Sequence, residues 1–376
     1  MSTTIQHLLD LCKKMTYPMV KQRASRVEHP KELSSDVATD AQRGTSILLW
    51  TAMLFVGILL GFYLLPRLYY ILPNDMARVK NIFEAIHHGE SPLPEIVVLG
   101  NSVVMNGIDG RQMNSILPGN PPVWNLSGPG QNLLESGLIL DEIDFPVRAV
   151  VLGILPGLLT EPQVNIPQNK LIAYKIYGYQ PSTETLAAFS RIVDKDTENL
   201  LHQSWWRTVI QSRWIVRSFI DNGLRSALRS DLTLERAQSD LFFPVAYTEK
   251  ISSAAQKSLM ERLHVKRGQM DGYLSIENQQ LLEYYWAQLN DQDIEFYVLV
   301  LPEHPNQIQL THADYYKNLE QDLDQLDQEK MGFHVINLYD LLQEDDFIDH
   351  VHTYETGAIK LTEALVNKLL ESEAIQ

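Results

Sequence analysis

The chain has 376 residues, of which 45% are hydrophobic and 21% are charged, a composition that is typical of globular proteins and excludes wholesale disorder. Its formal net charge is −16. Because no basic stripe offsets this acidity, the chain would repel a phosphate backbone, and we expect no binding to nucleic acid. The single cysteine, Cys12, lies near the N-terminus, which excludes an internal disulfide or a cysteine nucleophile in the rest of the chain.

Residues 46–65 form an uncharged segment with the sequence SILLWTAMLFVGILLGFYLL. A helix of this length spans roughly 30 Å, which is about the thickness of the hydrocarbon core of a bilayer. The segment is too long, and begins too far from Met1, for a cleaved signal peptide. A buried core helix is the alternative, but such helices seldom stay apolar on every face over this length. The sequence therefore predicts one transmembrane helix that is retained as an anchor.

The direction of this predicted anchor rests on a small charge asymmetry. Residues 1–45 carry seven Lys or Arg against five Asp or Glu, which favours a cytoplasmic N-terminal tail. The basic residues that immediately flank the segment are nearly balanced, with Arg67, Arg78 and Lys80 on the far side. We predict a single-pass membrane protein with its N-terminus in the cytoplasm and its main domain on the periplasmic or extracellular side.

The remainder of the chain is predicted to be an α/β domain. Residues 66–92 are expected to form a helical stalk, and residues 93–376 the main domain. Four short apolar runs have the character of strands buried on both faces, and helical segments over 276–289 and 315–328 precede the last two. The predicted strands lie within residues 96–100, 148–156, 294–302 and 333–338. Strands that alternate with helices indicate a parallel sheet covered by helices on both sides.

A different pattern fills the stretch from about residue 160 to residue 275. No run in it resembles a strand, and residues 204–228 are helical in pattern and rich in aromatic side chains. We interpret this stretch as a helical insertion that covers an edge of the sheet as a cap. Packing onto the core is the expected role of its aromatic side chains, with the lining of a substrate groove as the alternative.

A candidate nucleophile follows the first predicted strand. Ligands of open α/β sheets bind beyond the carboxyl ends of the strands, and Gly100-Asn101-Ser102 lies at such an end. Glycine permits a tight turn from strand to helix, which would place Ser102 at a helix start where the helix dipole stabilises a developing oxyanion. A serine after glycine is also a common helix N-cap, so this motif alone decides nothing.

The end of the chain supplies the partners that a serine nucleophile needs. Asp349 and His352 are separated by two residues, after the last predicted strand and before a terminal amphipathic helix. A serine needs a base to take its proton, and the base needs a carboxylate that fixes its tautomer. His350 and His334 are rival bases, but His350 breaks the Asp-x-x-His spacing and His334 lies inside a predicted strand. The sequence therefore predicts Ser102, Asp349 and His352 as a catalytic triad.

Gly-x-Ser after the first strand and Asp-x-x-His before the last helix resemble the motifs of the SGNH/GDSL hydrolase superfamily, over roughly residues 94–372. The resemblance implies a flavodoxin-like three-layer fold in which Ser102 is the nucleophile, His352 the general base and Asp349 the residue that orients His352. The family's oxyanion hole combines the serine amide, a glycine after the second strand and an asparagine after the third. Residues 123–132, with the sequence VWNLSGPGQN, resemble the second of these blocks, with Gly130 as its glycine.

The sequence departs from this family pattern in three places. Asn101 stands where the family usually has an acidic residue before the serine. The glycine that the family has after the serine is shifted by one position along the chain, to Gly107. The third block, which the family writes Gly-x-Asn-Asp, here reads Gly153-Ile154-Leu155-Pro156 and holds no asparagine. The missing oxyanion donor would then come from Asn132 or Gln131. Loss of such a donor costs roughly 10²–10³ in rate, which favours a specialised enzyme or an inactive relative over a fast general esterase.

An N-terminal anchor, an incomplete third block and a helical insertion are also similar to the membrane-tethered members that modify the cell envelope, among them the D-alanyl transfer protein of teichoic acids and polysaccharide O-acetyltransferases. This resemblance implies a carbohydrate substrate, the membrane and a membrane-bound O-acyltransferase as partners. It implies an esterase or acyltransferase. We expect no cofactor, and no metal site, since no spacing of the acidic residues resembles a calcium loop. Glu303 and His304, which follow the third predicted strand, are further candidates for substrate contact, with a loop pair whose hydrogen bonds are satisfied within the fold as the alternative. A non-catalytic scaffold that binds a glycan or a membrane partner is the competing hypothesis.

Overall fold

A computed structural model of the chain describes residues 46–61, 77–89, 92–204, 207, 240–244 and 271–372. The chain divides into two compact units, Met1–Leu64 and Leu65–Gln376. In the first unit, the described residues 46–61 are helical. None of the helices in the described residues is long and apolar enough to cross a membrane. Residues 62–65 of the predicted span, the predicted tail over 1–45 and most of the aromatic segment over 204–228 lie outside the described residues.

The second unit is built on a parallel five-stranded sheet with the strand order β2-β1-β3-β4-β5. The strands are β1 (Ile96–Gly100), β2 (Val123–Asn125), β3 (Ala149–Ile154), β4 (Glu295–Val300) and β5 (Phe333–Asn337). The predicted α/β class and parallel sheet are therefore confirmed, and the order is that of doubly wound sheets of the flavodoxin type. Strand β2 was not predicted from the sequence, because it has only three residues.

Helices precede and follow the strands along the chain. Before β3 they are α3 (Ala77–His88), α4 (Ser102–Gly107), α5 (Gly110–Ile116) and α6 (Leu133–Leu140). Between β3 and β4 lie α7 (Pro156–Thr160), α8 (Gln168–Ile176), α9 (Thr183–Phe189), α10 (Lys195–His202) and α15 (Ile276–Asn290). The chain closes with α16 (Pro305–Leu310), α17 (Ala313–Glu329), the 3₁₀ turn η1 (Glu344–Asp346) and α18 (Glu355–Glu371).

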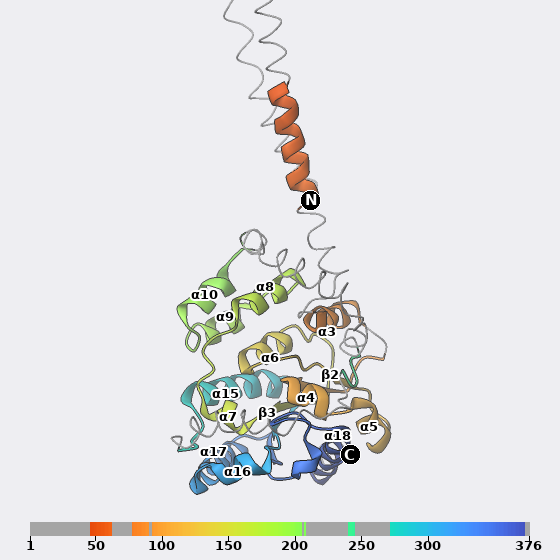
Figure 1. Cartoon of the computed structure of the whole chain (residues 1–376), viewed down its shortest axis with the longest axis vertical. Coiled ribbons are helices and arrows are strands. Elements are labelled where there is room, and N and C mark those ends of the chain that lie inside the picture. The colour runs from red at the N-terminus through yellow and green to blue at the C-terminus, as the bar shows by residue number, and fades with distance from the viewer. Residues whose placement is uncertain are drawn as a thin grey trace, which may run out of the picture. The chain divides into compact units, whose positions relative to one another are not determined.

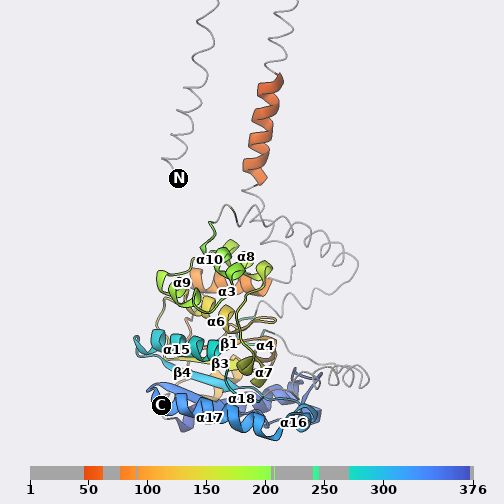
Figure 2. The same cartoon turned by 90° about the vertical axis from the view of Figure 1, so that its left-hand side faces the viewer.

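Alternate residues of each strand pack against helices on opposite faces of the sheet, as the twofold period of a strand requires. Val97 and Leu99 of β1 join a core cluster that includes residues of α3, α6, α8, α15 and α17. Ile96 and Val98 join a second cluster that includes residues of α4, α5 and α18. The sheet is thus the middle layer of three. Helices α8, α9 and α10 lie together at one end of the unit, beyond α6 (Figures 1 and 2).

Helix α3 lies within the predicted stalk, yet it belongs to the core of the second unit. Its apolar residues, including the fully buried Phe83, pack in the first core cluster. Arg78 of α3 is 0% exposed, and its guanidinium donates to the backbone carbonyls of Asn125, Ser127 and Asp240. Burial lowers the pKa of Arg78 to about 9, an effect that the Asp240 carboxylate opposes. This buried cation fastens α3 to the loop that follows β2.

A short segment from the long β3–β4 connection covers the β2 edge. The carbonyl of Leu241 accepts from the N–H of Asn125 at 2.6 Å, and that of Phe242 accepts from Gly110 at 2.9 Å. Arg111 pairs with the Asp240 carboxylate and lies 5.3 Å above the Phe242 ring. We call residues 240–244 the edge strap, because it takes up hydrogen-bonding groups that an edge strand otherwise leaves open.

Candidate active site

Ser102 is the first residue of α4 and directly follows the turn at the end of β1. The turn requires Gly100, whose φ is +147°, and a Cβ at this position would lie 2.4 Å from the carbonyl oxygen of Gly153. Asn101 caps the helix, since its side chain accepts from the N–H of Val103 at 2.9 Å. The sequence therefore places the hydroxyl at the carboxyl end of the sheet, at the start of a helix.

The structure brings the three residues of the predicted triad together. The Oγ of Ser102 lies 2.8 Å from Nε2 of His352, and Nδ1 of His352 lies 2.8 Å from Oδ2 of Asp349. The His352 and Asp349 side chains are 21% and 19% exposed, so the group is partly buried but reaches the surface. A hydroxyl, an imidazole and a carboxylate in this order can deprotonate the hydroxyl and stabilise the resulting imidazolium.

The loop that carries the imidazole is closed by its own hydrogen bonds. Oδ1 of Asp349 accepts from the N–H of Val351 at 2.8 Å and of His352 at 2.7 Å. The N–H of Ile348 donates to the carbonyl of His352 at 2.9 Å, and an antiparallel bridge joins residues 347 and 353. One carboxylate thus shapes the loop with one oxygen and orients the imidazole with the other.

Two residues that the sequence reasoning did not single out as site residues fix this loop to the rest of the domain. Asn106 of α4 donates through Nδ2 to the carbonyl of Thr353 at 2.9 Å, which ties the helix of Ser102 to the residue after His352. Asp346 binds Lys360 of α18 at 2.8 and 2.9 Å, and its carbonyl accepts from Tyr354 at 2.7 Å. Asp346 is therefore engaged in an ion pair with Lys360. Separately, no cluster of His, Cys, Asp or Glu that could hold a metal ion occurs within the described ranges.

The two rival bases, His334 and His350, make other contacts. His334 of β5 is 2.7 Å from Glu295 of β4 and stacks on Tyr297, so it is held at the sheet. His350 places its Nδ1 4.0 Å from Oδ1 of Asp349, on the oxygen that does not bond to the His352 ring. The imidazole of His352 is the one that lies within 2.8 Å of the Ser102 hydroxyl through its Nε2.

Besides Ser102, the residues predicted for the oxyanion hole lie in the loop after β2. This loop meets the serine turn where the N–H of Gly128 donates to the carbonyl of Gly100 at 3.1 Å. Gly130 adopts φ +57°, which favours glycine. Asn132 caps α6 through Oδ1 and donates from Nδ2 to the carbonyl of Asn165 at 2.8 Å, a bond that uses one of the two N–H groups of its amide. Gln131 is buried and donates to Ser136 at 3.0 Å.

The remaining predicted residues make contacts within the fold. Glu303 is buried and accepts from the Tyr316 hydroxyl at 2.6 Å. His304 caps α16 by accepting from the N–H of Asn306, and its ring packs 5.1 Å from Phe347. Burial lowers the pKa of His304, which favours its neutral form. Substrate contact by Glu303 and His304 stays a prediction.

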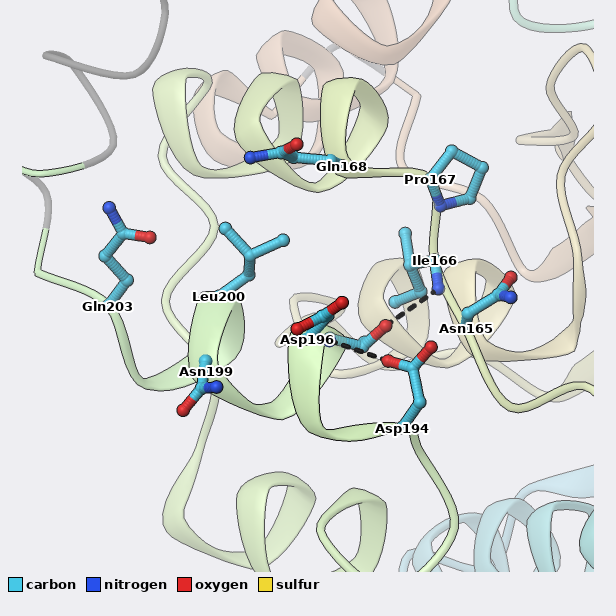
Figure 3. Close-up of a pocket in the computed structure, with 10 residues that line it drawn as sticks. Asn165, Ile166, Pro167, Gln168, Asp194, Asp196, Asn199, Leu200 and Gln203 are labelled. Atoms are coloured by element: carbon cyan, nitrogen blue, oxygen red, sulfur yellow. Dashed lines mark hydrogen bonds between the residues drawn. The ribbon is translucent and has the colours of Figure 1, made fainter.

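A cavity of about 590 Å³ lies between α8 and α10, and none of the predicted site residues lines it. Figure 3 shows Gln168 of α8 on one side of it and Leu200 of α10 on the other. Its lining is mostly polar and consists of Asn165, Ile166, Pro167, Gln168, Asp194, Asp196, Thr197, Asn199, Leu200 and Gln203.

The ionisation of Asp349 gives a prediction on acid stability. Partial burial alone would raise its pKa, but the hydrogen bonds from the His352 side chain and from the N–H groups of His352 and Val351 outweigh this and lower it to about 2. A lowered pKa in the folded state stabilises the fold above the unfolded value near 3.8, and this stabilisation is lost as the pH falls towards 2. We expect the difference in unfolding free energy between wild type and Asp349→Asn, measured in urea, to shrink by about 2 kcal/mol from pH 6 to pH 2. If the difference in unfolding free energy stayed constant from pH 6 to pH 2, the lowered pKa of Asp349 in the folded protein would be wrong.

No protein-family model matches this chain, and no curated protein matches it either.

Proposed function

We propose that this chain is a membrane-anchored serine esterase or O-acyltransferase of the SGNH type, which acts on a cell-envelope or exported polysaccharide through an acyl-serine intermediate. The observation that carries the proposal is the pair of 2.8 Å contacts that join Ser102 Oγ to His352 and His352 to Asp349. The strand order, with the serine after β1 and the imidazole in the last loop, fits the predicted family fold.

The proposed reaction proceeds in two halves. Ser102 Oγ attacks the carbonyl carbon of the acyl donor while its proton passes to Nε2 of His352, and Asp349 stabilises the imidazolium. The tetrahedral intermediate collapses, the bond to the leaving alcohol breaks, and His352 returns the proton to that alcohol. Water or a sugar hydroxyl then attacks the acyl-serine with His352 again as base, which releases the acid or the acylated sugar and restores Ser102.

The oxyanion is assigned to two backbone N–H groups and to the side-chain amide of Asn132. Ser102 begins α4, so its N–H is one of the first four that have no partner inside the helix. Gly130 supplies a second N–H from the loop beside the serine turn, and Asn132 is the remaining donor in this assignment. β3 leads through Leu155 into α7 without the asparagine of the family's third block. A hole with fewer side-chain donors suits a specialised enzyme better than a fast general esterase.

The cellular setting follows from the N-terminal segment. Residues 46–65 would anchor the chain, with the tail in the cytoplasm and the main domain in the periplasm or outside the cell. A membrane-bound O-acyltransferase would supply the acyl group, and the acceptor would be a carbohydrate. The reaction as written needs no cofactor. The competing proposal is an inactive scaffold that binds a glycan or the membrane partner, and the absent third-block asparagine favours it.

A fluorophosphonate probe tests the proposal on the full-length protein in detergent. Attack by Ser102 forms a phosphorus–oxygen bond, fluoride leaves, and His352 takes the serine proton. We expect wild type to be labelled, Ser102→Ala to remain unlabelled, and His352→Ala to be labelled at least about 10²-fold more slowly. Ser115→Ala, a change at an exposed serine of α5, should label like wild type. A folded wild type that takes up no probe would favour the scaffold.

A further inference from the structure

The turn that carries Gly130 is held from two sides. The N–H of Gln131 donates to the carbonyl of Gly128 at 3.2 Å, with Pro129 and the positive-φ Gly130 between them, which is the pattern of a type II turn. This hydrogen bond uses the N–H of Gln131 and not that of Gly130. The Gly128 end is fixed to the serine turn through the carbonyl of Gly100. The other end is fixed by helix α8 of the insertion.

Lys170 of α8 makes the contact on that other side. Its Nζ donates to the carbonyl of Gly130 at 2.7 Å and lies 2.9 and 3.1 Å from the two carboxylate oxygens of Glu135. The Glu135 side chain is 1% exposed, and the Lys170 side chain is 14% exposed. Glu135 in turn accepts from the N–H of Asn132 at 3.0 Å and donates its own N–H to the Asn132 side chain. One ammonium thus joins the insertion to both ends of the segment 130–135.

The loss of the Lys170–Glu135 ion pair is expected to disturb the Gly130 turn strongly, for an electrostatic reason. Burial raises the pKa of Glu135, and the Lys170 ammonium is the main influence that opposes the rise. Removal of one partner of a buried ion pair leaves a buried charge without compensation, which the surroundings can relieve only by proton uptake or rearrangement. Here that rearrangement would begin at the Glu135–Asn132 hydrogen bonds and at the Gly130 carbonyl.

We propose that Lys170 is a positioning residue for the reaction, through which the helical insertion sets the orientation of the Gly130 turn at the oxyanion hole. The inference rests on the proposed function and adds to it a role for the insertion at the chemical step. Lys170 acts on the turn through the Gly130 carbonyl and has no assigned contact with the reacting atoms. A displacement of about 1 Å at a catalytic donor can cost on the order of 10² in rate, so a moderate shift of the turn is sufficient.

The test compares Lys170→Met with Lys170→Arg in the full-length protein, with hydrolysis of 4-nitrophenyl acetate and fluorophosphonate labelling as readouts. Methionine keeps the length of the side chain but donates no hydrogen bond, and we expect kcat to fall about 10- to 100-fold with KM within about twofold of wild type. Arginine restores hydrogen-bond donors to the Gly130 carbonyl and the Glu135 carboxylate. We expect Lys170→Arg to recover kcat to within about fivefold of wild type.

Lys175→Met is the matched control, because Lys175 is on the same helix but faces α10. Its Nζ donates to the carbonyls of Leu200, Leu201 and Gln203, so its loss weakens the insertion without touching the turn. An unchanged kcat in Lys170→Met overturns the role of Lys170 and leaves the proposed function standing. The same holds if Lys175→Met loses as much kcat as Lys170→Met while the two variants have the same unfolding free energy. A wild type with neither hydrolysis nor labelling overturns the proposed function, and the role of Lys170 falls with it.

Discussion

Replacing Asp349 by asparagine is expected to slow fluorophosphonate labelling of Ser102 on the order of 10⁴-fold at neutral pH while the protein stays folded. The asparagine oxygen can still accept from the loop N–H groups that now bond to Oδ1. Its NH₂ group, however, would face Nδ1 of His352 and favour the tautomer that carries its proton on Nε2. That nitrogen could then no longer accept the serine proton.

The control for this variant is Asp345→Asn, which makes the same chemical change at an exposed residue of the same loop region. Labelling rates of the two variants are compared at one pH with far-ultraviolet circular dichroism as the check on folding. We expect Asp345→Asn to label within about twofold of wild type, since a surface carboxylate contributes little. If Asp349→Asn also labelled at the wild-type rate, the carboxylate would not orient the base.

Replacing Gly100 by alanine should cause a large loss of stability. Its φ of +147° is one that alanine rarely adopts, and the added Cβ would lie 2.4 Å from both the Gly153 carbonyl oxygen and Cγ2 of Val104. The clash falls where β1 and β3 pair and where the helix of Ser102 begins. We expect a loss of roughly 3 kcal/mol or more in unfolding free energy, from backbone strain and overpacking together.

Gly119→Ala separates strain from crowding. Gly119 also has a positive φ, +79°, but a Cβ there meets no atom within 4 Å. Its replacement should cost only about 1–2 kcal/mol, the penalty of a left-handed backbone for an alanine. Urea unfolding of both variants measures the difference, and equal losses would mean that the contact with β3 is not what demands glycine at position 100.

The parts of the fold that the sequence predicted are those with a strong local signal. Apolar, β-branched runs predicted β1, β3, β4 and β5, and the alternation with helices predicted a parallel sheet. β2 was missed because its three residues, VWN, are too short to show a period. Helix α3 was assigned to a stalk because the partners of its apolar side chains, such as Tyr174 of α8 beside Phe83, come together only when the chain is folded.

The same distinction holds for the site. Gly100 before Ser102 and the Asp349–His352 spacing are local motifs, and they drew attention to side chains that the fold brings within hydrogen-bonding distance. Lys170 and Glu135 are 35 positions apart and lie on different helices. Lys170 belongs to no motif, and Glu135 belongs to a capping box with Asn132, which indicates a helix start and not an ion pair. Asn106 similarly depends on a contact with Thr353 across 247 positions of the chain. Such pairs become visible only in three dimensions.

The edge strap has a practical consequence for anyone who shortens this protein. Residues 240–244 come from the middle of the long β3–β4 connection, so a truncation that removes the connection as a dispensable decoration also removes the acceptor for the N–H of Asn125 and the carboxylate that faces Arg78. The bared strand would be a template for pairing with a neighbouring molecule, and the trimmed protein should self-associate more strongly than the intact one.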